Sequence, residues 1–105
     1  MARPFRPRAV AGIALWPGAG SASDHPGLVA IEDGVAPLRV ARIDFPYRRE
    51  GRRAPDRAPK LMASLRDEVA GLCDRWGTSS GHLVLGGRSM GGRIASMVAA
   101  GADGM

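Results

Sequence analysis

Short apolar runs alternate with segments of helical periodicity along this chain, and that order limits the possible folds most strongly. Residues 9–16, 38–45 and 82–86 are mainly apolar or β-branched and are followed by proline or glycine, as buried strands are. Residues 58–76 carry apolar side chains three and four positions apart, and residues 26–35 and 90–100 are expected as shorter helices. Strands alternating with helices indicate an α/β fold, in which a parallel sheet has flanking helices.

The segments between these elements read as turns and loops. Residues 17–20 form a proline- and glycine-rich turn, and residues 47–59 form an arginine- and proline-rich loop without periodicity. Residues 77–81 are a second loop, and residues 101–104 are expected to close the last helix. The 105 residues are enough for one small domain.

The net charge of +5 comes almost entirely from arginine. The arginines gather in two clusters: Arg3, Arg6 and Arg8, then Arg48, Arg49, Arg52, Arg53 and Arg57. Neither cluster has an aromatic stacking platform or a known binding motif, which argues against a nucleic-acid partner. Cys73 is the single cysteine and is expected to be a small core residue, so no internal disulfide can form.

The N-terminus imitates a secretory signal, because three arginines precede the apolar residues 9–16. Prolines interrupt that stretch, however, and residues 17–20 fit the end of a strand better than a cleavage site. No apolar run is long enough to cross a membrane. We therefore expect a cytoplasmic protein with a basic tail at residues 1–8 and one domain from residue 9 to residue 105.

Residues 87–91 read Gly-Arg-Ser-Met-Gly and match G-x-S-x-G directly between a predicted strand and a predicted helix. A sharp turn there projects the Ser89 hydroxyl above the sheet, and Gly87 and Gly91 permit the close backbone approach that the turn needs. The Met90 N–H would face the oxyanion of a tetrahedral intermediate. Ala19 is the candidate for the second donor, with Gly18 shaping its turn.

A serine nucleophile needs a base, and the base needs an orienting carboxylate. The residues after Ser89 contain Asp103 but no histidine. His82 begins the strand that leads to Ser89 and would lie at its far end. His25 follows the first strand and could reach the rim of the site, but a loop histidine is more often simply exposed, so we expect the base to be absent from this chain.

Residues 83–93, with the core Gly-Gly-Arg-Ser-Met-Gly, resemble one branch of the α/β-hydrolases. That branch includes the hydrolase-like domains of testis-expressed proteins and of a nonspecific-lethal complex subunit, and it is related to dienelactone hydrolases. Residues 17–20 and 43–47 fit the same pattern. The resemblance implies a serine hydrolase in which Ser89 attacks an ester or similar acyl bond of a small molecule, without a metal or organic cofactor.

The chain departs from that branch in two ways. Pro17 stands where members usually have histidine, and members continue past this helix with strands that bear the acid and the base. Residues 9–105 therefore look like the N-terminal half of a domain, an incomplete α/β-hydrolase fold that is inactive alone. Missing strands would leave unpaired sheet edges, which favour self-association.

Three other interpretations compete with the hydrolase. Residues 18–23 almost match the dinucleotide-binding G-x-G-x-x-G, with Asp44 where a ribose-binding acid would stand, but Ser23 replaces the third glycine. A phosphate loop at residues 87–94 lacks the required lysine and Ser/Thr, because Arg93 and Ile94 stand there. A non-catalytic, hydrolase-like binding module is the remaining alternative.

Overall fold

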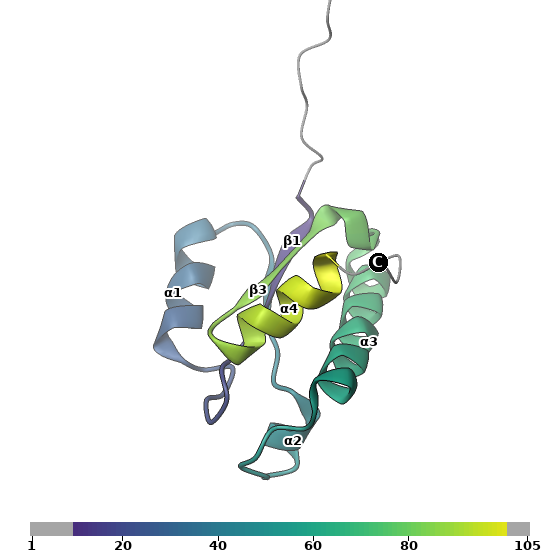
Figure 1. Cartoon of the computed structure of the whole chain (residues 1–105). Helices are drawn as coiled ribbons and strands as arrows, with labels where there is room; N and C mark the ends of the chain where they lie inside the picture. Colours follow the sequence, from purple (N-terminus) through teal and green to yellow (C-terminus); the bar gives the residue numbers. More distant parts are fainter. Residues whose placement is uncertain (1–9, 101–105) are drawn as a thin grey trace, which may run out of the picture.

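The computed structural model describes residues 10–100, which form alternating strands and helices (Figure 1). The strands are β1 (Gly12–Trp16), β2 (Val40–Arg42) and β3 (Leu83–Gly87). The helices are α1 (Pro26–Val35), α2 (Pro46–Arg49), α3 (Ala58–Trp76) and α4 (Met90–Ala100), and a 3₁₀ turn, η1 (Ser80–His82), precedes β3. None of the helices in this range is both long and apolar enough to cross a membrane.

The three strands form a parallel sheet in the order β2-β1-β3. Ala14 in the middle of β1 pairs with Ala41 of β2 on one side and with Leu85 of β3 on the other. Because neighbouring parallel strands need crossover connections, α1 links β1 to β2, and α2 and α3 link β2 to β3. The α/β class with a parallel sheet and flanking helices is confirmed.

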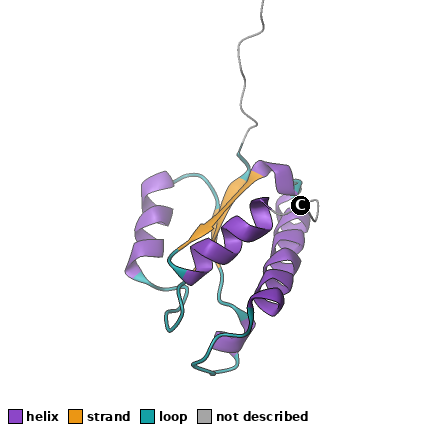
Figure 2. Ribbon diagram, in the orientation of Figure 1, coloured by secondary structure: helices purple, strands orange, loops and turns teal. Residues whose placement is uncertain are grey.

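Helices cover both faces of the sheet (Figure 2). On one face, α3 and α4 pack against β1 and β3 through a core that includes Ala14, Leu65 and Ile94. On the other face lies α1, whose single fully buried side chain is Leu28. Cys73 is half-buried and packs against the α3 and α4 core, where the sequence predicted a small core residue.

The expected bounds of α1, α3 and α4 agree with the structure, but the strands and loops differ from expectation. β1 begins at Gly12, and β2 covers only three residues of the predicted 38–45 segment. The chain then leaves the sheet, and Pro46 begins one turn of helix (α2) that extends into the predicted loop at residues 47–59. The basic tail at residues 1–8 and the expected turn at residues 101–104 lie outside the described residues.

Candidate active site

Only Arg88 and Ser89 separate the end of β3 from the start of α4, so the chain reverses direction at Ser89. Ser89 has a φ of 49°, and it is the only non-glycine residue with positive φ among residues 10–100. Its carbonyl accepts a hydrogen bond from the Arg93 N–H at 2.9 Å, which continues the first turn of α4. A left-handed serine is costly, and its surroundings hold it in that conformation.

The glycines on both sides of Ser89 allow the end of β1 to approach the turn. A Cβ atom at Gly87 would overlap the Trp16 carbonyl oxygen, and one at Gly91 would overlap the Trp16 and Pro17 carbonyl oxygens. The Arg88 N–H donates to the same Trp16 oxygen at 3.1 Å. The turn is therefore locked against β1, and larger residues at either glycine would force backbone apart.

The turn after β1 lies directly beside Ser89. A Cβ atom at Gly18 would be 3.3 Å from Ser89 Cβ and 3.4 Å from the Arg88 carbonyl oxygen. Gly18 is buried, whereas Ala19 and Ser89 are exposed. In the described part of the chain, the N–H groups of Ala19 and Met90 donate to no other residue. The structure thus brings together the residues that the sequence predicted as nucleophile and oxyanion donors.

Ser89 opens into a cavity of about 630 Å³, which is within the size range of small-molecule sites. Its walls come from the turn after β1, the loop before α3, and the first turns of α3 and α4. The lining residues are Ala19, Pro55, Asp56, Ala58, Leu61, Ser89, Met90, Arg93 and Ile94. The wall combines apolar side chains with three polar ones, Asp56, Ser89 and Arg93, and Asp56 and Arg93 contribute the charges.

The sequence analysis missed both charged residues. Arg93 follows Ser89 by four positions, so a helix starting at the turn already places the two residues on one face. The spacing could therefore have predicted that Arg93 lies near Ser89. Asp56 belongs to an aperiodic loop, and no pattern in the sequence placed it near Ser89.

The carboxylate of Asp56 is engaged by two cations. Arg52 Nη1 lies 2.9 Å from Oδ1, and Lys60 Nζ lies 3.7 Å from the same oxygen. The hydrogen bonds from Arg52 hold the pKa of Asp56 below its usual value. Asp56 is therefore ionised at neutral pH and is a poor general acid or base there.

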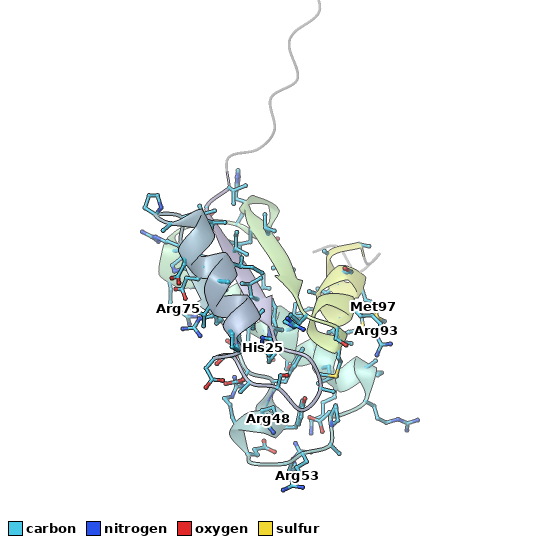
Figure 3. All side chains as sticks on the ribbon, turned by 90° about the vertical axis from the view of Figure 1, so that its left-hand side faces the viewer. His25, Arg48, Arg53, Arg75, Arg93 and Met97 are labelled. Carbon is cyan, nitrogen blue, oxygen red and sulfur yellow. The ribbon has the colours of Figure 1, made fainter. Side chains whose placement is uncertain are left out.

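Neither histidine lines the cavity. His25 is the N-cap of α1, where its Nδ1 accepts a hydrogen bond from the Gly27 N–H at 2.9 Å. Figure 3 shows His25 beside α1, whereas Arg93 belongs to α4. His82 lies in η1, at the opposite end of β3 from Ser89, and its carbonyl accepts from the Ala11 N–H at 2.8 Å. The described residues bring no imidazole to the cavity wall.

The loop that follows β1 is hydrogen-bonded to Asp44, just after β2, and this contact uses the carboxylate that would have bound a dinucleotide ribose. Asp44 Oδ1 accepts from the Ser23 N–H at 2.7 Å, and Oδ2 accepts from the Ser23 hydroxyl at 2.9 Å. Helix α1 begins only at Pro26, so the glycines at 18 and 20 do not lead directly into a helix. Across residues 10–100, no group of three or more His, Cys, Asp or Glu could hold a metal ion.

A parallel sheet with helices on both faces, and a serine of positive φ between a strand and a helix, are features of the α/β-hydrolase class. Residues 10–104 match the family described as alpha/beta hydrolase domain. The chain belongs to that family. Neither a curated protein nor a solved structure matches it.

Proposed function

We propose that this protein is a serine hydrolase that acts on an ester or similar acyl bond of a small molecule, with Ser89 as the nucleophile. The observation that carries the proposal is the backbone of Ser89, whose φ of 49° presents the side chain to a cavity at the start of α4. Strained backbone conformations cluster at active sites, and the nucleophilic serine of α/β-hydrolases lies in such a strained turn with its hydroxyl exposed.

In the proposed reaction, Ser89 Oγ attacks the acyl carbon, its proton passes to a base, and the carbonyl oxygen becomes an oxyanion. The Met90 and Ala19 N–H groups would bind that oxyanion, and Gly18 keeps the Ala19 turn close to Ser89. The N-terminus of α4 adds a favourable field for negative charge. The acyl-enzyme then forms as the alcohol leaves, and water releases the acid.

The acid and base of the triad belong, in this proposal, to residues beyond this 105-residue sequence. His25 caps α1 through Nδ1, and no described histidine contributes to the cavity wall. We infer that the chain alone is inactive toward esters, and that a longer form of the domain supplies the missing groups.

Within the α/β-hydrolases, we propose the branch of the testis-expressed and nonspecific-lethal-complex proteins. The supporting feature is the segment Gly86-Gly87-Arg88-Ser89-Met90-Gly91, which forms the turn described above. The cytoplasmic location that the sequence indicates stays a prediction.

The test is covalent labelling of the purified chain by a fluorophosphonate probe, compared with Ser89→Ala. We expect slow labelling that Ser89→Ala abolishes, because phosphonylation requires the serine oxygen. Ser96→Ala is the matched control, since Ser96 is also exposed on α4 but does not line the cavity. Labelling that survives in Ser89→Ala would contradict the role of Ser89.

One observation favours a second candidate, a non-catalytic module that binds a partner or ligand: the described cavity contains a serine but no base. A folded chain that stays unlabelled, and that also stays unlabelled when extended along its gene, would favour this module over the hydrolase.

A further inference from the structure

We propose that the cavity beside Ser89 selects substrates that carry a carboxylate, which Arg93 binds. That the ligand is an ester substrate rests on the proposed hydrolase function. The binding of a carboxylate by Arg93 is independent of that function.

Arg93 carries the one cavity charge that lacks a partner within the described structure. No Asp or Glu of residues 10–100 forms an ion pair with it, whereas the other charged residue in the wall, Asp56, is paired with Arg52 and Lys60. Arg52 is further paired with Glu50 at 2.7 Å. The charges of Arg52 and Lys60 balance those of Glu50 and Asp56. The positive charge of Arg93, on the cavity wall, is therefore not compensated by this group.

The position of Arg93 suits a ligand that also reaches Ser89. Residues four positions apart on a helix lie on the same face, with Cβ atoms roughly 5–6 Å apart. The Arg93 N–H donates to the Ser89 carbonyl, so this spacing holds in the first turn of α4. A guanidinium there can bind a carboxylate through two parallel hydrogen bonds while a short carbon chain places the ester carbonyl near Ser89 Oγ.

Apart from Asp56, Ser89 and Arg93, the side chains that line the cavity are apolar and can contact a carbon chain. Ala58, Leu61, Met90 and Ile94 line the cavity from α3 and α4, and Ala58 is the one among them that is only half-buried. Methylene groups gain free energy when they leave water for such a surface. The fitting substrate is therefore the monoester of an aliphatic dicarboxylic acid, with an apolar body and one negative end.

The test is a binding measurement on Ser89→Ala, which cannot turn the ligand over. Monomethyl adipate, an anion at neutral pH, is compared with the neutral dimethyl adipate by titration followed by NMR. We expect the monoester to bind about tenfold more tightly, since a hydrogen bond to a charged group contributes about that factor. The preference should weaken as salt is added.

Substitutions of single arginines test whether Arg93 is the charge that causes the preference for the monoester. Adding Arg93→Gln should remove the preference, and Arg93→Lys should keep part of it. Arg75→Gln is the matched control, because Arg75 is an exposed arginine near the end of α3 that does not line the cavity (Figure 3). Equal affinity for the two esters, no binding of either, or a preference that survives Arg93→Gln would overturn the proposal.

This outcome is separate from that of the labelling experiment. If the fluorophosphonate never labels Ser89 but the monoester still binds through Arg93, the hydrolase proposal fails and the carboxylate site stands. If Ser89 is labelled and the two esters bind equally, the hydrolase proposal stands and the assignment to Arg93 fails.

Discussion

At the residue level, the exposed side chain of Ser89 lies on a buried support. Ser89 is exposed, yet its neighbour Met90 is only 8% exposed and belongs to the main core. Trp16, at the end of β1, is fully buried and lies next to Phe45, which in turn stacks on Tyr47 with ring centroids 6.4 Å apart. The turn that carries Gly18 and Ala19 follows directly from this aromatic group, so its position depends on well-packed side chains.

Tyr47 makes that support sensitive to alkali. Burial raises the pKa of its phenol, against the smaller opposing effects of Arg48 and the Gly20 amide. Because the folded chain holds the phenol proton more tightly than the unfolded chain, this contribution to stability is full below pH of about 10 and is lost as pH rises beyond that value. Tyr47→Phe should remove this part of the alkaline loss.

Tyr47 is the only tyrosine in the chain, so the absorbance of tyrosinate reports its titration directly. We expect a midpoint above that of the same chain unfolded in urea, and a smaller alkaline shift in the urea midpoint for Tyr47→Phe. Identical midpoints in the folded and unfolded chain would show that burial does not hold the proton.

At the scale of elements, three segments meet at the elbow: the end of β1, the end of β3 and the start of α4. Their backbones are so close that Gly87 and Gly91 leave no room for a side chain against the Trp16 carbonyl. This contact joins the nucleophile turn to the turn that bears Ala19. One backbone junction therefore positions Ser89 and the two N–H groups that we propose as oxyanion donors.

Gly91→Ala should break this junction. Its methyl group would overlap two carbonyl oxygens of the β1 end, which are backbone atoms and cannot rotate away. We expect the free energy of unfolding to fall by about 2–3 kcal/mol, as measured by urea denaturation, together with loss of Ser89 labelling.

Gly34→Ala is the control, because a Cβ atom at Gly34 in α1 would contact nothing within 4 Å. Alanine there should leave stability unchanged or raise it by up to about 1 kcal/mol, through its better helix propensity. Equal effects of the two substitutions would contradict the close-approach explanation.

At the scale of the whole molecule, the sheet has two open edges, β2 and β3, because β1 lies between them. β2 is only three residues long and carries Arg42, whose guanidinium binds Glu32 and the Ser23 carbonyl. β3 has five residues with no charge or proline, and Val84 is 45% exposed. Natural proteins usually protect such an edge with charge, proline or a covering segment.

Self-association of this chain is therefore expected through β3. Sedimentation velocity over a range of concentrations should show species larger than the monomer, and Val84→Lys should shift them toward the monomer because it places a charge on the edge strand. Met97→Lys replaces an equally exposed apolar residue on α4 and should have little effect. A chain that stays monomeric at all concentrations would refute the expectation.

The sequence alone determined the parts of this protein that depend on local pattern. Apolar spacing predicted the bounds of α3, because one face of the helix has to be buried, and the expected bounds of α1 and α4 also agree with the structure. The G-x-S-x-G match at residues 87–91 predicted a turn between strand and helix, and the structure has that turn, since so sharp a reversal requires glycine on both sides.

Tertiary packing determines which distant segments of the chain meet. The order β2-β1-β3 places Gly18 beside Ser89, and the packing of α3 against α4 brings Asp56 into the same cavity as Arg93. Likewise, the chain leaves the sheet after Arg42 and forms α2, although residues 38–45 have the composition of a longer strand. Local periodicity indicates whether one face of a helix or strand is buried. The packing of the whole chain determines which element covers that face.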